Sequence, residues 1–174
     1  MDKEAIADLI DAKHVQLISW LEQQPDESWT TGPEGKWTQG QQALHLLQSI
    51  KPLNDALSLP NFVLRYKFGK ANRPVRDYNA IVKRYQERLV DAKGKTFKGS
   101  QNMKVPTLED KKYILNRLQT ESKKLQYKTK KISDKNLDSV ILPHPLMGKM
   151  PVREIIMWTA YHVEHHTEIM QAKN

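Results

Sequence analysis

The chain has 174 residues, of which 39% are hydrophobic and 28% charged, a composition typical of one globular domain with its own core. It has no cysteine, which excludes disulfides, thiolate metal ligands and cysteine nucleophiles, so only His, Asp or Glu could hold a metal. No apolar run approaches the roughly 20 residues that a membrane span needs, and the start MDKEAIADLI is acidic and amphipathic. We therefore predict a single domain over residues 1–174, cytoplasmic and without a membrane segment.

The net charge of +8 is unevenly distributed. Residues 65–135 contain 21 Lys and Arg against 7 Asp and Glu, a net charge of +14, and the remaining residues carry 7 against 13, a net charge of −6. Such a basic segment can bind nucleic acid or an anionic membrane surface. Because no nucleic-acid-binding motif accompanies the charge, we favour a lysine-rich solvated surface and keep nucleic-acid binding as the weaker alternative.

Hydrophobic periodicity predicts five helices, at residues 2–24, 38–58, 77–92, 108–131 and 151–171. Thr38 is the predicted N-cap of the second helix, with Gln41 three residues later, and Pro52 predicts a kink or an early end. Four segments are predicted as loops, at residues 25–37, 59–76, 93–106 and 141–151. Residues 59–76 contain at most a short helical turn, and residues 93–106 are predicted to be mobile. Four long helical patterns with little strand signal predict an all-α helical bundle.

Three of the six histidines lie in a five-residue window of the last predicted helix. His162 and His166 are four residues apart, so they lie on one face and can bind one divalent ion from the same side. The apolar face of this helix continues through both of them, and a buried histidine needs a partner, which a metal ion would supply. The alternative is that they are solvated surface histidines near the C-terminus. His45 lies away from the apolar stripe of the second helix, on a face with Gln41, Gln42 and Ser49, which predicts a surface or groove position.

Three stretches together resemble the DinB-like superfamily, within it the metal-dependent hydrolases of the DinB family or YfiT-like branch: WTTGPEGKWTQGQQALHLLQSI, FGKANRP and HPLMGKMPVREIIMWTAYHVEHHTEIM. The resemblance covers nearly the whole chain in the expected order. It implies an all-α, up-down-down-up four-helix bundle with a short extra helix in the long central connection. It also implies a homodimer and a divalent metal, most often nickel or zinc, on three histidines.

The same resemblance implies a ligand set. His45, in the context LHLL, matches the first ligand, and His162 and His166 match the other two, with His165 as a neighbour and alternate ligand. Many members of the family have a glutamine where this chain has Ile169. The reaction implied is either metal-dependent hydrolysis or transfer of a low-molecular-weight thiol, and the alternative is a non-catalytic metal-stabilised bundle that acts through dimerisation or small-molecule binding.

A hydrolase usually needs a general base near its metal. Glu164 and Glu168 lie about 200° around the last helix from the paired histidines and are poor candidates. Two residues elsewhere are candidates for the pocket: Glu34 in the tryptophan-flanked loop, and His144 just before Pro145. The alternatives are a solvated turn residue for Glu34 and loop packing for His144.

Overall fold

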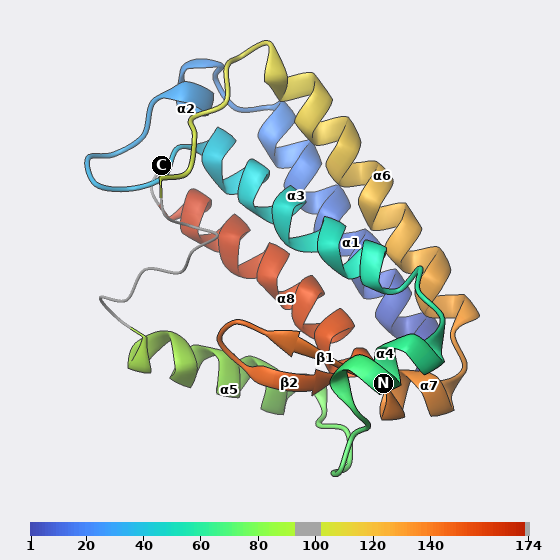
Figure 1. The fold of residues 1–174 in the computed structure, drawn as a ribbon. Coiled ribbons are helices and arrows are strands. Elements are labelled where there is room, and N and C mark those ends of the chain that lie inside the picture. The colour runs from blue at the N-terminus through green and yellow to red at the C-terminus, as the bar shows by residue number, and fades with distance from the viewer. Residues whose placement is uncertain (93–101, 173–174) are drawn as a thin grey trace.

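A computed structural model of the chain describes residues 1–92 and 102–172. The described residues form eight helices and one antiparallel two-stranded sheet (Figure 1): α1 Lys3–Glu22, α2 Glu27–Thr30, α3 Gln39–Ala56, α4 Asn61–Phe68, α5 Tyr78–Asp91, α6 Asp110–Lys131, α7 Asp134–Ser139, β1 Ile141–His144, β2 Gly148–Pro151 and α8 Val152–Gln171. The predicted all-α class is confirmed. No helix of the described ranges is both long and apolar enough to cross a membrane.

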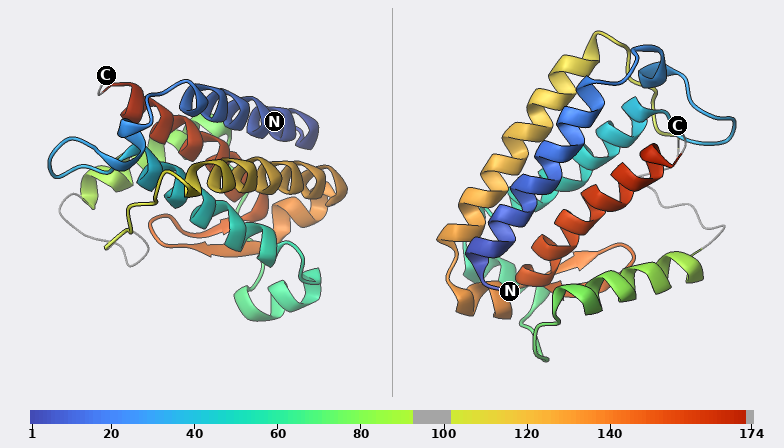
Figure 2. Two further views of the ribbon diagram at one scale, coloured as in Figure 1. Left: turned by 90° about the horizontal axis from the view of Figure 1, so that it is seen from above. Right: turned by 180° about the vertical axis from the view of Figure 1, so that it is seen from behind.

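The four long helices α1, α3, α6 and α8 surround the core. Both α1 and α3 pack against α6 and against α8, and Figure 2 shows the four helices from two further sides. Each helix contributes fully or almost fully buried side chains, among them Leu17, Ile50, Leu118 and Ile156. Burying one such side chain is worth roughly 1.5–3 kcal/mol, so apolar burial holds the metal-ligand candidates of α3 and α8 on a rigid frame. The predicted helix at 77–92 is present as α5, which packs on α8.

The start of α3 is fixed by its capping residues and by a close approach. The Thr38 side chain accepts from the Gln41 backbone N–H, and the Gln41 side chain accepts from the Thr38 backbone N–H, so the predicted capping box is confirmed. A Cβ on Gly40 would lie 2.6 Å from the backbone oxygen of Trp29, so α2 can pack here only against glycine. Pro52 lies inside α3 and does not end it early.

Three of the predicted loops contain regular structure. Residues 25–37 include the one-turn helix α2. Residues 141–151 were predicted as a loop, which is wrong, because β1 and β2 form a hairpin there with Ile141 opposite Pro151 and His144 opposite Gly148. Strands this short, interrupted by Pro143, show no alternating pattern long enough to detect. Residues 59–76 contain the two-turn helix α4. Most of the predicted mobile loop at 93–106 lies outside the described residues.

A buried carboxylate fixes the segment that leads into α5. Glu154, in the first turn of α8, has a fully buried side chain. It accepts two hydrogen bonds from the Arg73 guanidinium, at 2.5 and 2.7 Å, and one from the Arg76 backbone N–H at 2.7 Å. Burial by itself raises the pKa of Glu154, but these bonds outweigh it and the net pKa is lowered, so the carboxylate stays charged.

Candidate metal centre

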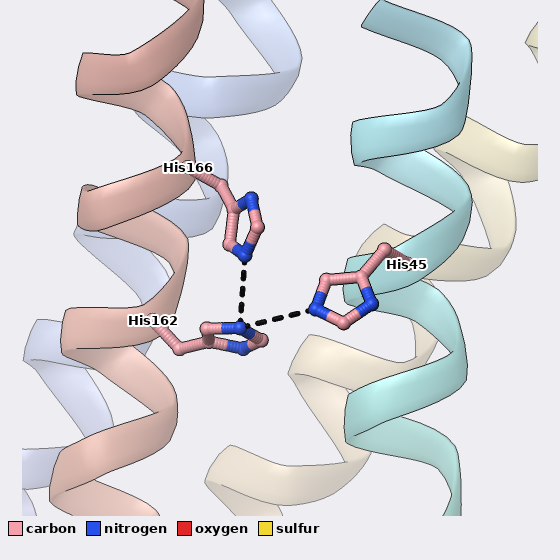
Figure 3. Close-up of side chains that lie close together, drawn as sticks. All are labelled: His45, His162 and His166. Carbon is pink, nitrogen blue, oxygen red and sulfur yellow. Dashed lines mark hydrogen bonds between the residues drawn. The ribbon is translucent and has the colours of Figure 1, made fainter. Parts of the chain in front are cut away.

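Three imidazoles converge between α3 and α8. His45 projects from α3, and His162 and His166 project from successive turns of α8 (Figure 3). The Nε2 atom of His162 lies 3.3 Å from Nε2 of His45 and 2.9 Å from Nε2 of His166. One ligand atom from each of the three lies within 4.8 Å of the others, so the cluster can hold a metal ion.

Two of the distances between these nitrogens match those expected when imidazoles bind one metal ion. Two imidazole nitrogens, each about 2.0–2.1 Å from one ion and separated by an angle of about 90–110°, lie about 2.9–3.4 Å apart. Both separations at His162 fall in this range. A set of imidazoles suits zinc, nickel, copper or iron rather than magnesium or calcium. Two of the three nitrogen separations therefore suit one divalent transition-metal ion.

The protonation states also suit a metal. Burial lowers the pKa of His45 to about 4. Burial, and then the neighbouring imidazoles of His166 and His45, holds the pKa of His162 well below its ordinary value of 6.5. At neutral pH both rings are therefore uncharged and each has a lone pair to donate.

Polar residues of α3 orient the histidines of α8. The Gln42 side-chain oxygen, which can only accept, lies 2.5 Å from Nδ1 of His166, so Nδ1 carries the proton and the lone pair is on Nε2. Ser49 Oγ lies 3.4 Å from Nδ1 of His162, and its hydroxyl can donate to this atom or accept from it, so it helps to orient the ring without determining its tautomer. Gln42 and Ser49 lie one turn before and one turn after His45 on the same face of α3, so one helix face supplies both a candidate ligand and the orienting groups.

Two indoles pack on the cluster. The Trp158 ring stacks on His162 at 4.5 Å between centroids. The Trp37 ring lies 5.1 Å from the His45 ring and is nearly parallel to that of His166 at 6.5 Å. These rings hold the imidazoles in place and limit the access of water from their side.

The cluster opens onto a cavity of about 850 Å³, near the upper end of the roughly 300–1,000 Å³ typical of small-molecule sites. Most of its wall is apolar, with side chains that include Leu53, Phe68, Leu89, Leu142, Leu146 and Ile155. None of the described residues that line it is Asp, Glu, Lys or Arg, although 28% of the chain is charged. The cavity is therefore suited to an uncharged, largely apolar molecule.

The other sequence candidates lie at different distances from the cluster. His165 lines the cavity beside His166, with ring centroids 5.4 Å apart, but it is not among the three converging residues. His144 also lines the cavity. Glu34 is exposed and is not among the lining residues. Glu164 pairs with Lys13 at 2.7 Å.

Sequence reasoning assigned no role to three residues at the site. Tyr85, in the predicted helix 77–92, lines the cavity with its ring centroid 6.3 Å from that of His162. Burial, and then Tyr161, raises the pKa of Tyr85 to about 12, so it remains a phenol at neutral pH. Gln42 and Ser49 were placed only on the face of His45, and their spacing from that residue was the available signal.

Comparison with known proteins identifies a family. The family model described as the DinB superfamily matches residues 9–170, nearly the whole chain and all three converging histidines. No curated protein and no solved structure matches the chain.

Proposed function

The chain belongs to the DinB superfamily, and on this premise we propose that it is a metal-dependent hydrolase of uncharged, apolar substrates. His45, His162 and His166 would hold the ion, with nickel or zinc as the metal. The observation that carries the proposal is the convergence of three neutral imidazoles on one point at the wall of a large apolar cavity.

A divalent ion on three imidazoles keeps open positions, where it polarises a carbonyl oxygen and lowers the pKa of water toward ~7. The protein's own part is positioning and exclusion. Gln42 and Ser49 orient the imidazoles, Trp37 and Trp158 shield them, and the apolar wall binds the substrate. Because the described lining has no carboxylate, we assign no proton transfer to Asp or Glu.

Hydrolysis is preferred over thiol transfer because of the cavity's charge. Common low-molecular-weight thiols carry charged groups, which lose hydration in an apolar cavity unless they are paired. The described lining offers no charged partner. Thiol transfer is the second candidate, and the volume of about 850 Å³ supports it, because two small molecules fit in such a space.

Metal content and turnover test this proposal together. We expect purified protein to contain about one divalent ion per chain, His162→Ala to lose it, and His165→Ala, as the matched control, to keep it. Neutral esters and amides with apolar side chains are then assayed with and without an added thiol. Turnover without thiol supports hydrolysis, and turnover only with thiol supports transfer. Metal without turnover supports the non-catalytic alternative, and protein that binds no metal contradicts the proposal.

The finer architecture is also a proposal. The packing of α1 and α3 against α6 and α8 supports the family's up-down-down-up four-helix bundle in one domain. A homodimer and a cytoplasmic location stay predictions. Nucleic-acid binding through residues 65–135 also stays the weaker alternative, and binding that falls steeply with salt would support it.

A further inference from the structure

His144 is held in one tautomer by the turn of the β-hairpin. Its Nδ1 atom accepts two backbone hydrogen bonds, from the N–H of Leu146 at 3.1 Å and from the N–H of Met147 at 3.0 Å. A backbone N–H can only donate, so Nδ1 must carry the lone pair and the ring proton must be on Nε2. At neutral pH the His144 ring is therefore a donor at Nε2 and not an acceptor there.

The ring stays in that form over the physiological range. Burial lowers the pKa of His144 to about 4, and protonation would also place a proton on Nδ1, which would break both turn bonds. A group of this kind is a poor general base, because the nitrogen that would accept a proton is already engaged by the backbone. Its available function is to donate one hydrogen bond from Nε2.

The donor lies at the cavity wall near the metal cluster. The His144 ring lines the cavity and contacts Trp158 with centroids 4.1 Å apart, and the same indole stacks on His162 at 4.5 Å. Within residues 1–92 and 102–172, no group hydrogen-bonds to Nε2 of His144. A molecule in the cavity can therefore reach both this donor and the three-histidine cluster.

We propose that His144 binds the carbonyl oxygen of an uncharged ester, amide or ketone through its Nε2–H, and so selects a carbonyl-bearing apolar ligand. This inference rests on the proposed function only in so far as the bound carbonyl compound is a substrate of the metal site. At this donor a carboxylate is disfavoured, because the described lining has no Lys or Arg to pair with it and the neutral Nε2–H supplies only one hydrogen bond. A pure hydrocarbon would leave the Nε2–H unpaired.

Two substitutions separate the donor from the turn. Asparagine at position 144 can still accept from the backbone N–H two residues on, as Asn does in an Asx turn, but its side chain ends short of the Nε2 position. His144→Asn should therefore keep the hairpin and lose the donor. His144→Gln places an amide N–H near the Nε2 position and removes the turn acceptor, so it should melt earlier and keep part of the ligand affinity.

The experiment compares two probes of the same shape, 4-phenylbutan-2-one and 2-methyl-4-phenylbut-1-ene, in which C=CH₂ replaces C=O. Affinities are measured by calorimetry on protein as purified and again after chelation. For His144→Asn we expect a roughly three- to tenfold weaker ketone affinity, the effect of one hydrogen bond, and an unchanged alkene affinity. His144→Gln should lose less of the ketone affinity.

Three results would overturn the inference. These are a folded His144→Asn variant that binds both probes as the wild type does, an equal loss for both probes, and a wild type that binds neither. Nitrogen NMR of the imidazole gives an independent readout, since Nε2 should be the protonated nitrogen at neutral pH. Because probe binding and NMR are also measured without metal, their failure is distinguishable from failure of the metal site.

Discussion

Gln42 on α3 accepts a hydrogen bond from Nδ1 of His166 on α8 at 2.5 Å. Gln42 is almost fully buried and lies one turn before His45 on the same helix face. The bond joins two helices that are distant in sequence and fixes the lone pair of His166 on the nitrogen that faces the cluster. The orientation of one candidate ligand thus depends on the helix that carries another.

Replacing Gln42 should weaken metal binding without unfolding the protein. For Gln42→Leu we expect roughly 10- to 100-fold lower metal affinity, as is typical when a partner of a metal-ligating histidine is lost. The measurement is competition against a chromophoric chelator. Gln48→Leu is the matched control, since Gln48 lines the cavity from the same helix and makes no hydrogen bond to His45, His162 or His166. Equal affinities for the two variants would argue against this role.

The sequence alone predicted the long helices well, because each has an apolar stripe that persists over several turns. The hairpin was missed because each strand has only four residues and pairs only with the other. Periodicity predicted a surface or groove position for His45, and the half-buried side chain lines the cavity. Periodicity could not bring His45 to the histidines of α8, because that contact depends on how two distant helices pack, and only the family resemblance identified the three as a set.

Single-residue chemistry was hardest to predict. His14 is buried on α1, although the sequence prediction gave this helix only as the range 2–24 and named no buried histidine in it. The tautomer of His144 was also out of reach, because two backbone groups of an unpredicted hairpin determine it. Hydrophobic patterning reports burial averaged over a helix face, and it carries no information on which polar atom meets which partner.

The buried His14 should make the stability of the fold depend on pH. Burial lowers the pKa of His14 to about 4, although the hydrogen bond from its Nδ1 to the Ile10 carbonyl at 2.8 Å acts the other way. Its Nε2 is buried and has no partner among the described residues. Because the folded pKa is below the ordinary 6.5, the unfolded chain binds the proton first, and stability is lost as pH falls from about 6.5 to 4.

We expect His14→Leu to remove part of that loss. Between pH 7 and 4.5 the wild type should lose about 2 kcal/mol more unfolding free energy than His14→Leu does, as measured by urea denaturation. The control is Ile10→Val, which changes buried volume in the same helix but adds or removes no titrating group. Ile10→Val should change the unfolding free energy by the same amount at both pH values. If His14→Leu also changed it by the same amount at both, His14 would not be the source of the pH dependence.

Neutralising Glu154 should destabilise the fold far more than neutralising an exposed glutamate. The Glu154 carboxylate is fully buried, whereas Arg73 and Arg76 are about 30% exposed. Breaking a buried ion pair typically costs about 3–5 kcal/mol, and because the arginines can recover some hydration we expect about 2–3 kcal/mol for Glu154→Gln. Chemical denaturation at pH 7 gives the value, with Glu168→Gln, on the exposed side of α8, as control.

The ion pair of Glu154 with Arg73 and Arg76 should also make stability depend on pH. The folded pKa of Glu154 is lowered, so its contribution is present above the ordinary value of about 4.3 and is lost as pH falls through the folded pKa. The stability difference between wild type and Glu154→Gln should therefore shrink under strongly acidic conditions. A difference that is constant from pH 7 down to pH 3 would show that the charge of Glu154 does not stabilise the fold.

Tryptophan fluorescence should report which ion the cluster binds and where. Trp158 stacks on His162 and Trp37 lies against His45 and His166, so two of the four tryptophans adjoin the cluster. Paramagnetic Ni²⁺ quenches a nearby indole, whereas Zn²⁺ has a filled d shell and no redox chemistry and quenches little. We expect added nickel to remove up to half of the tryptophan emission, with saturation at one ion per chain. Zinc should displace the nickel, and the emission should then recover.

Trp158→Phe and Trp37→Phe should each reduce the quenching, whereas Trp20→Phe, which removes an indole outside the cavity lining, should not. If all three variants were quenched alike, the ion would be bound away from His45, His162 and His166.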